Sequence, residues 1–258
     1  MGKVSVLVAD DDPAIRKLLS VNLSQRNYDV HEAQNGEDVL NFLRQQIPDL
    51  LILDLVMPVL NGDEICAWVR GRGSDVPIIV LSAYNEEDLK VRALDAGADD
   101  YVTKPFKTEE FLARLRALMR RSNALDEAAA DRKMTIEGIN IDLKGRRAFV
   151  DGADIHLTRT EIALLATLAE HHDAVLTHDE LLAKVWGEEY RGSSHYLHVY
   201  LGRVRKKIGD KYSALLETVA GLGYVLHSSF PNISPAGSTD ASPTGNPSPD
   251  TSFSPNLT

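Results

Sequence analysis

The chain has 258 residues, a length that fits one large domain or two of ordinary size, and it carries a net charge of −10 at pH 7. This acidity excludes a protein that is basic over its whole surface, as a nucleic-acid coat would be, but not one with a local basic region. The single cysteine, Cys66, excludes an intramolecular disulfide and a metal site built from several cysteines. The sequence has no long apolar run and no signal-peptide pattern, which predicts a cytoplasmic protein without a membrane partner.

The first 121 residues alternate strand and helix patterns. Residues 50–53 are apolar throughout, which is typical of a strand buried on both faces of a sheet. A helical pattern follows each strand pattern, and the last of these helices covers residues 109–121. Five such βα units predict an α/β domain with a doubly wound, five-stranded parallel sheet over residues 1–121. The predicted strands are residues 4–9, 28–33, 50–53, 77–81 and a short one around 101–102.

The composition changes after residue 121. Residues 122–133 are rich in Ala, Asp and Glu and have no apolar period, which predicts a linker. Residues 134–228 hold short β-like pieces, three helical patterns and a closing hairpin, which predict a second, α+β domain. Residues 229–258 are dominated by Pro, Ser, Thr and Asn and are predicted to be a disordered tail. The predicted helices cover about 159–171, 178–186 and 194–208, and the predicted hairpin covers 215–227.

Polar side chains follow four strands of the predicted sheet. Three consecutive acids, Asp10 to Asp12, come after the first strand, Asp54 follows the third, Ser82 ends the fourth and Lys104 follows the fifth. The carboxyl ends of parallel strands meet at one edge, so we expect these side chains in one crevice. Clustered carboxylates favour a hard divalent cation such as Mg²⁺. Beside such an ion, Asp54 can act as a nucleophile toward a phosphoryl group whose oxygens Lys104 and Ser82 hold.

Each of these features also has a simpler interpretation. An acidic triplet after a strand commonly caps the next helix, because the positive end of the helix dipole favours acids there. A Lys-Pro pair, as at Lys104, is commonly a turn. The occurrence of all four features at strand ends, in the correct order, favours the phosphoryl-transfer site.

Four stretches of this region resemble the receiver domain of two-component response regulators, which has a flavodoxin-like fold. The resemblance implies that Asp54 is the phosphoacceptor, that Ser82 and Lys104 bind the phosphoryl group, and that Tyr101 is an aromatic switch. It also implies a cis peptide bond between Lys104 and Pro105. The implied Mg²⁺ site comprises Asp10, Asp11, Asp54 and the carbonyl of Val56. The stretches are VADDDP (8–13), LDLVMP (53–58), LSA (81–83) and GADDYVTKPF (97–106).

A different class with an aspartyl-phosphate intermediate, the hydrolases of the haloacid dehalogenase type, needs a second Asp two residues after the nucleophile. Val56 stands there, so the acid–base group of a turnover enzyme is missing. Val56 and Tyr84, two residues after Ser82, are also poor at orienting a water molecule for hydrolysis. We therefore expect no turnover enzyme but a protein that phosphorylates and dephosphorylates itself and holds its phosphoryl group for minutes or more.

A basic helix marks the second domain. Residues 203–211 carry a net charge of +4 in an otherwise acidic chain, and they end the helix predicted over 194–208. A basic helix that follows a shorter helix suits insertion into a DNA major groove. A solvated cationic face is the alternative, but the adjoining apolar helices and the closing hairpin speak against it.

Residues 134–228 resemble the winged helix-turn-helix effector domain of OmpR/PhoB-type regulators. The resemblance rests on LTRTE (157–161), LLAKVWG (181–187), RVRKKI (203–208), and ETV (217–219) with GLGY (221–224). It implies that 194–208 is the recognition helix and 215–227 the wing, that Arg203 reads bases, and that further residues contact the DNA backbone. The implied backbone contacts are Trp186, His195, Tyr196, Tyr200, Lys206 and Thr218.

Two positions depart from that family pattern, because Ala220 and Gly202 stand where arginines are common. Minor-groove insertion of the wing is therefore in question, and Gly202 costs the recognition helix about 1 kcal/mol. The entry of that helix, from Ser194 to Leu197, is most similar to the potassium-responsive Kdp-type branch.

In this family, phosphorylation promotes a symmetric receiver dimer. Charges suited to its interface are Lys90 with Glu110 and Asp100 with Arg114, each pair occurring twice in an isologous contact. Exposed helix charges without a partner are the alternative. We thus expect a phosphorylation-switched transcription factor whose partners are a sensor histidine kinase, promoter DNA, a second copy of the chain and RNA polymerase. A receiver-driven protein-interaction module and a nonspecific nucleic-acid binder are the remaining alternatives.

Overall fold

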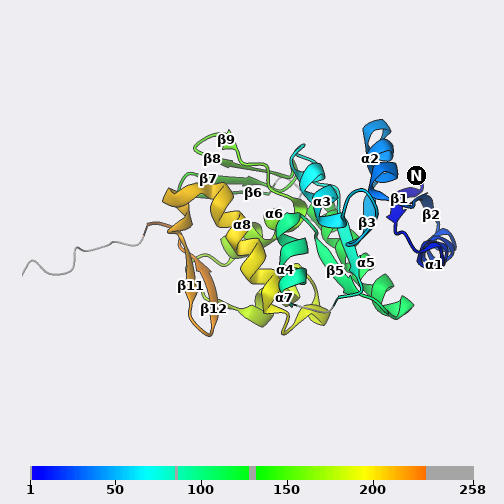
Figure 1. The fold of residues 1–258 in the computed structure, drawn as a ribbon. Coiled ribbons are helices and arrows are strands. Elements are labelled where there is room, and N and C mark those ends of the chain that lie inside the picture. Colours follow the sequence, from blue (N-terminus) through cyan, green and yellow to red (C-terminus); the bar gives the residue numbers. More distant parts are fainter. Residues whose placement is uncertain (1, 85–86, 128–131, 231–258) are drawn as a thin grey trace, which may run out of the picture.

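The computed structural model describes residues 2–84, 87–127 and 132–230. Its N-terminal part is a parallel sheet with strand order β2-β1-β3-β4-β5 and helices on both faces (Figure 1). The predicted doubly wound α/β fold is thus confirmed. Its elements are β1 (Val4–Ala9), α1 (Pro13–Ser24), β2 (Tyr28–Ala33), α2 (Gly36–Gln45), β3 (Leu50–Asp54), α3 (Gly62–Arg70), β4 (Ile78–Ser82), α4 (Glu87–Ala96), β5 (Asp100–Thr103) and α5 (Thr108–Glu127).

Alternate residues of the strands supply two separate apolar layers. Leu51 and Leu53 of β3 face one layer with helices α2, α3 and α4, whereas Leu50 and Ile52 face the other with α1 and α5. All five residues of β3 are buried, as its continuous apolar run predicts. Burial on both faces fixes the strand register, because a slip of one residue would exchange the two sets of side chains.

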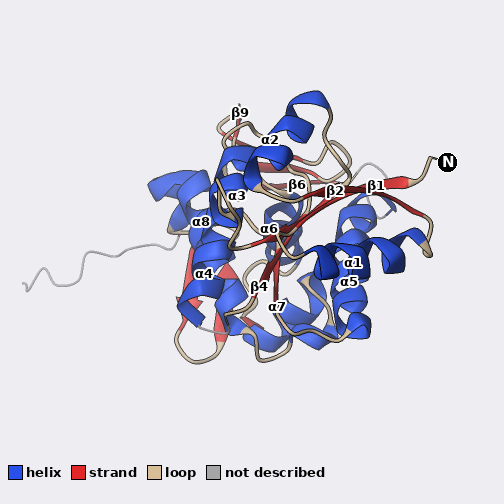
Figure 2. Ribbon diagram, turned by 45° about the vertical axis from the view of Figure 1, so that its right-hand side comes forward, coloured by secondary structure: helices blue, strands red, loops and turns tan. Residues whose placement is uncertain are grey.

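The C-terminal part contains two antiparallel sheets around three main helices (Figure 2). A four-stranded sheet, β6-β7-β8-β9, precedes the helices, and a three-stranded sheet, β10-β12-β11, ends in the predicted hairpin. This is the predicted winged-helix arrangement. Its elements are β6 (Lys133–Ile136), β7 (Ile139–Asp142), β8 (Arg147–Val150), β9 (Ala153–Asp154), α6 (Arg159–Glu170), β10 (Leu176–Thr177), α7 (His178–Val185), the 3-10 helix η1 (Glu188–Tyr190), α8 (Ser194–Ser213), β11 (Leu216–Val219) and β12 (Gly223–Leu226).

Local signals explain where these helices begin and break. Thr158 and Thr177 each form a capping box with a glutamate three residues later, which starts α6 and α7. Within α8, Gly209 takes a left-handed φ of 81°. The regular helix therefore ends at residue 208, which is also the last residue of the helix predicted from the sequence.

Helix α5 is longer than the helix predicted over residues 109–121. Helix α5 continues to Glu127 and β6 begins at Lys133, so the expected linker over 122–133 is helical in its first half. Its Ala- and Glu-rich composition favours helix without an apolar stripe, since helix propensity does not require burial. The tail predicted to be disordered, apart from residues 229 and 230, lies outside the described residues.

The two parts of the chain pack directly against each other. Helix α8 lies beside α4 and helix α6 beside α5, and side chains of α4 and α8 belong to one apolar cluster (Figures 1 and 2). The recognition-helix candidate is therefore covered on one side by the N-terminal part. Within the described residues, no helix is long and apolar enough to cross a membrane.

Candidate functional site

Three carboxylates meet at the carboxyl edge of the parallel sheet. Asp10 and Asp11 follow β1, Asp54 ends β3, and one oxygen of each lies within 4.8 Å of the others. Asp10 and Asp54 are buried and Asp11 is exposed. Asp12 instead caps α1, because its side chain accepts a hydrogen bond from the backbone N–H of Ala14. The acidic triplet thus both caps a helix and contributes two side chains to the cluster.

Lys104 is the cation of this cluster. Its Nζ lies 2.6 Å from Oδ2 of Asp10 and 3.0 Å from Oδ2 of Asp54, and a cis bond joins it to Pro105. Burial alone would lower the pKa of Lys104, but its hydrogen bonds to Asp10 and Asp54 outweigh burial, and the pKa is raised. The ammonium group therefore stays charged.

The pKa of Asp54 is raised above its ordinary value, mainly because burial penalises the charged carboxylate. Lys104 lowers this pKa, whereas the charges of Asp10 and Asp11 raise it. A divalent cation among the three carboxylates would act in the same direction as Lys104. Three hard oxygen donors around one lysine fit such an ion by charge and by ligand type.

The backbone around Asp54 leaves no room for a side chain at Gly62, the first residue of α3. A Cβ atom there would lie 2.4 Å from the carbonyl oxygen of Asp54. The N–H of Gly62 donates to the carbonyl oxygen of Leu55 at 2.9 Å, so the helix start and the strand end are tied together. Glycine at this position is therefore part of how Asp54 is positioned.

Ser82 is the last residue of β4, the strand that pairs with β3, and Tyr101 lies in β5, the strand on the other side of β4. The Ser82 hydroxyl is buried and accepts a hydrogen bond from the N–H of Tyr84 at 3.1 Å. The Tyr101 ring is buried, and its hydroxyl donates to the carbonyl oxygen of Tyr84 at 2.6 Å. Val56, two residues after Asp54, is 53% exposed, and Tyr84, two residues after Ser82, is 49% exposed.

The predicted DNA-contact residues fall into two groups. Trp186, Tyr196 and Tyr200 are buried and their rings contact one another, Trp186 lying 5.1 Å from Tyr200 between ring centroids. His195 and Arg203 are half-buried, whereas Lys206 and Thr218 are exposed. These three side chains are not accessible to DNA in this arrangement, and Tyr196 and Tyr200 contact the N-terminal part directly.

The interface between these tyrosines and the N-terminal part is polar as well as apolar. The hydroxyl of Tyr200 donates to the carbonyl oxygen of Ala98 at 3.0 Å, and the hydroxyls of Tyr190 and Tyr196 both donate to the carboxylate of Asp100. Arg114, from α5, lies 3.5 Å from the same carboxylate. Burial followed by the charge of Asp100 raises the pKa of Tyr196.

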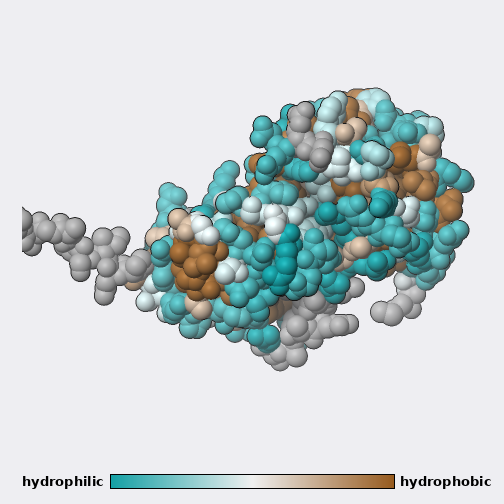
Figure 3. Space-filling model, turned by 90° about the horizontal axis from the view of Figure 1, so that it is seen from below, coloured by the Kyte–Doolittle hydropathy of each residue, from teal (hydrophilic) through white to brown (hydrophobic). Residues whose placement is uncertain are grey.

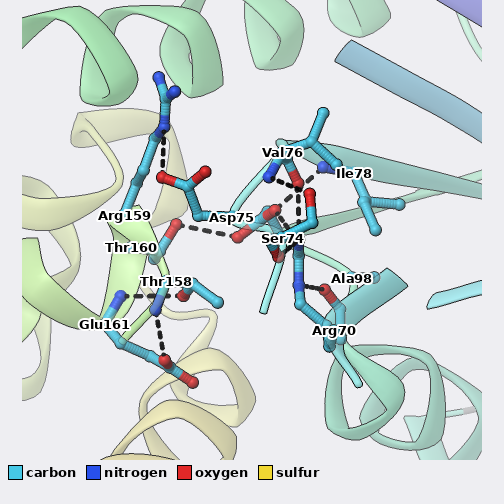
Figure 4. Close-up of polar contacts among 12 residues, drawn as sticks. Arg70, Ser74, Asp75, Val76, Ile78, Ala98, Thr158, Arg159, Thr160 and Glu161 are labelled. Carbon is cyan, nitrogen blue, oxygen red and sulfur yellow. Dashed lines mark hydrogen bonds and ion pairs between the residues drawn. The ribbon is translucent and has the colours of Figure 1, made fainter. Parts of the chain in front are cut away.

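The start of α6 makes further contacts with the N-terminal part (Figure 4). Nε of Arg159 lies 3.1 Å from Oδ2 of Asp75, and the hydroxyl of Thr160 donates to Asp99 at 3.1 Å. Asp99 is also bound by Arg70 at 2.7 Å. No local sequence pattern predicts these interdomain contacts, including the hydrogen bond from Tyr190 to Asp100, since they join residues between 61 and 102 positions apart.

The wing tip has little polar character. Figure 3 shows a largely hydrophilic face with an apolar patch over the β11–β12 hairpin, whose turn carries the exposed side chain of Leu222. Ala220 is exposed in the same turn. The turn residues 220–222 therefore supply no cation for a phosphate or a minor groove.

Comparisons with known proteins agree with both halves of the fold. The family model described as "Response regulator receiver domain" matches residues 6–116, and the model described as "Transcriptional regulatory protein, C terminal" matches residues 152–226. The chain is 42% identical over 229 residues to "Response regulator MprA" of Mycolicibacterium vanbaalenii, covering 88% of this chain and 99% of the relative. It is 43% identical over 221 residues to "Transcriptional regulatory protein KdpE" of Mycobacterium tuberculosis, covering 85% and 97%.

Solved structures give the same result. A cysteine-to-serine mutant of RitR superposes with a TM-score of 0.72 at 26% identity, covering 88% of this chain and 99% of that chain. The nearly equal identities to proteins named MprA and KdpE do not favour the Kdp-type branch over other branches.

Proposed function

The chain belongs to the OmpR/PhoB-type two-component response regulators, and we propose that a sensor histidine kinase phosphorylates it on Asp54 to control its binding to promoter DNA. The observation that carries this proposal is the meeting of three carboxylates within reach of one ion, beside the ammonium group of Lys104. The proposed division is a receiver domain (1–121), a linker (122–133), a winged-helix effector domain (134–228) and a tail (229–258).

The chemistry follows from the placement of the charges. An oxygen of Asp54 attacks the phosphorus, the phosphorus–nitrogen bond of the kinase phosphohistidine breaks, and an acyl phosphate forms. Lys104 then pairs with a phosphoryl oxygen in place of Asp54, and Ser82 donates to another. Mg²⁺, held by Asp10, Asp11, Asp54 and the carbonyl of Val56, supplies positive charge that offsets these anionic groups when it is bound.

We propose that the protein is not a turnover enzyme. Val56 and Tyr84, two residues after Asp54 and Ser82, carry side chains that are poor at orienting a water molecule for hydrolysis. The acyl phosphate is therefore cleaved slowly by water, and the protein serves as its own phosphoryl acceptor. A phosphoaspartyl hydrolase would need a carboxylate where Val56 stands.

The output surface is helix α8 with the β11–β12 wing. Arg203 reads bases and the other predicted residues contact the DNA backbone, with the recognition helix in the major groove. RNA polymerase is the further proposed partner at the promoter. The proposed backbone contacts are Trp186, His195, Tyr196, Tyr200, Lys206 and Thr218.

Receiver dimers bring two effector domains to tandem half-sites about one helical turn apart. The proposed pairs across the two-fold axis are Lys90 with Glu110 and Asp100 with Arg114. In the single chain, Arg114 already lies near Glu110 and Asp100, at 3.4 and 3.5 Å, so the charges are gathered on one face of the receiver.

Phosphorylation of the full chain by a small phosphodonor, followed by mass spectrometry, tests the acceptor. We expect a stable adduct on the wild type that Asp54→Asn abolishes and that needs Mg²⁺. The matched control is Asp12→Asn, which alters the neighbouring acid that caps α1 but leaves the adduct in place. An adduct on Asp54→Asn would contradict the assignment.

Selection of bound DNA from random sequence, with and without the phosphodonor, tests the output. We expect one tandem motif to be enriched by the phosphorylated chain. Equal retention of all sequences at a stated salt concentration would instead identify a nonspecific binder.

A further inference from the structure

A cavity lies between the two domains, beside the recognition-helix candidate α8. Its volume is about 780 Å³, which is in the range of roughly 300–1,000 Å³ that small-molecule sites occupy. The receiver contributes the ends of α3 and α4, and the effector domain contributes β8, the segment from β9 to α6, and α8. Figure 4 shows part of this wall, with Arg70, Ser74, Asp75, Thr158 and Glu161. The cavity therefore requires the docked state, in which the two domains pack as in this structure.

Positive charge prevails in the wall of this cavity. Six of its side chains are cations, namely Arg70, Arg146, Arg147, Arg203, Lys206 and Lys207, and four are acids. Three of the acids already pair with a cation, and these pairs are Asp75 with Arg159, Asp154 with Arg147 and Glu161 with Lys207. The fourth acid, Asp95, is exposed near the end of α4. The cavity therefore favours an anionic ligand.

Arg203 is the side chain of this wall that lacks an acceptor. It is only 14% exposed, and its Nη1 lies 3.9 Å from Oε1 of Glu161, which is too far for a hydrogen bond. The same carboxylate holds Nζ of Lys207 at 2.6 Å, so its charge is already offset. Among the residues that the structure describes, none accepts a hydrogen bond from the buried Nη2 of Arg203. A buried charged donor requires an acceptor, and an anion in the cavity would supply one.

Two cations of α8 indicate which kind of anion the cavity takes. Arg203 and Lys206 stand three residues apart, so they lie on the same side of the helix, and both line the cavity. A forked guanidinium and an ammonium together suit the oxygens of a phosphate group. We propose that these two side chains bind the phosphate group of a small molecule in the cavity between the domains. Ile155 and Ser74 line the remaining space, which is large enough for the rest of an organic phosphate.

The ligand and DNA would use the same side chains. Arg203 is the proposed base-reading residue and Lys206 a proposed backbone contact, and the ligand engages both while the domains stay docked. A bound phosphate compound therefore withholds them from DNA and favours the docked state by mass action. The site itself is independent of the proposed function, whereas this competition rests on it.

Calorimetric titration of the unphosphorylated full chain tests the site. The titrants are inorganic phosphate, AMP and glucose 6-phosphate, at constant ionic strength and in EDTA, which removes the Mg²⁺ that would bring phosphate to Asp54. We expect the tightest of the three to bind with a dissociation constant of about 1 mM or less, and adenosine, which lacks phosphate, to bind at least tenfold more weakly. Tightest binding by inorganic phosphate identifies the free ion as the ligand, and tightest binding by an ester identifies an organic phosphate. If none of the three binds, the inference is wrong.

Variants locate the bound phosphate. Arg203→Met and Lys206→Met should each weaken binding about tenfold, since each removes a charged hydrogen-bond donor. Lys184→Met, at an exposed lysine of α7 outside the cavity wall, is the matched control and should bind as the wild type does. Asp95→Asn removes a negative charge on the receiver side, so it should tighten binding about two- to fivefold. Lys206 and Asp95 are exposed, so these two variants decide the test if Arg203→Met folds poorly. Unchanged binding in both Lys206→Met and Asp95→Asn would place the phosphate elsewhere and overturn the inference.

Competition with the selected DNA tests the consequence. At ten times its dissociation constant, the phosphate compound should lower the DNA affinity of the wild type about tenfold, whereas adenosine at the same concentration should have no effect. DNA affinity that is unchanged at saturating ligand would show that Arg203 and Lys206 are not withheld from DNA, and the competition would be wrong. If the wild type binds no DNA with or without the phosphodonor, the proposed function fails, and the calorimetric titration still decides the site.

Discussion

The ammonium group of Lys104 bridges two carboxylates, lying 2.6 Å from Asp10 and 3.0 Å from Asp54. It is the charge that lowers the pKa of Asp54 against the effect of burial.

Replacing this lysine should impair the nucleophile. In Lys104→Met, Asp54 loses the neighbour that lowers its pKa, so a larger fraction is protonated and unable to attack, and the effect grows as the pH falls. We expect phosphorylation by a small phosphodonor to slow at least tenfold, a ~1.4 kcal/mol loss. Rates measured between about pH 5 and 8 check this, with Lys107→Met, an exposed lysine nearby, as the control.

The lifetime of the acyl phosphate should depend on the side chains two residues after Asp54 and Ser82. Val56→Asn or Tyr84→Glu introduces a polar group that can orient a water molecule, so we expect dephosphorylation to accelerate about tenfold. Loss of the adduct over time in excess EDTA measures this rate after the donor has been removed. Unchanged rates in both variants would show that water access is controlled elsewhere.

Arg114 lies under the docked effector domain and in the proposed dimer contact. Arg114→Asp places a second negative charge beside Asp100, so phosphorylation-dependent dimers should disappear in sedimentation experiments. Arg116→Asp, two residues along α5, is the comparison variant and should dimerise as the wild type does. Dimerisation of both variants would refute the assignment of this face.

The docked state should weaken in mild acid because of His195. Burial, and next the charge of Lys90, lowers the pKa of His195, whereas Glu87 and Asp100 raise it and Arg114 lowers it.

A histidine with a lowered pKa binds fewer protons in the docked state than in the undocked one, so docking is fully favoured above the ordinary pKa of about 6.5 and is lost as the pH falls below it. Sedimentation coefficients between about pH 7.5 and 5.5 should therefore report a more extended chain at the acidic end. The same series with His195→Gln should be flatter.

Two glycine substitutions should have opposite effects on stability. Gly62→Ala forces a Cβ atom against the Asp54 carbonyl, and we expect a loss of about 1–3 kcal/mol in the free energy of unfolding together with slower phosphorylation. Gly202→Ala meets no atom within 4 Å and lies within α8, so it should gain about 1 kcal/mol. Denaturant unfolding of the full chain measures both.

Much of the fold follows from periodicity. The apolar run of β3 and the alternation of strand and helix patterns predict the parallel sheet, and the order of its polar strand ends predicts the meeting of Asp10, Asp54 and Lys104. The full extent of α5 does not follow from the sequence, because its last turns carry no apolar stripe from which to predict helix. The docking of Tyr190 on Asp100 does not follow from it for another reason. Each residue has an ordinary local role, and only the packing of two domains brings them together.

The length of the connection between α5 and β6 has a consequence for how the two domains separate. Only five residues stand between Glu127 and Lys133, and a fully extended chain of that length spans about 20 Å. An undocked effector domain therefore remains close to its docking face, at a local concentration on the order of millimolar. Release of α8 therefore depends on competition at short range. A partner that binds the face of α4, β5 and α5 must displace an effector domain that stays tethered beside this face and can redock at once.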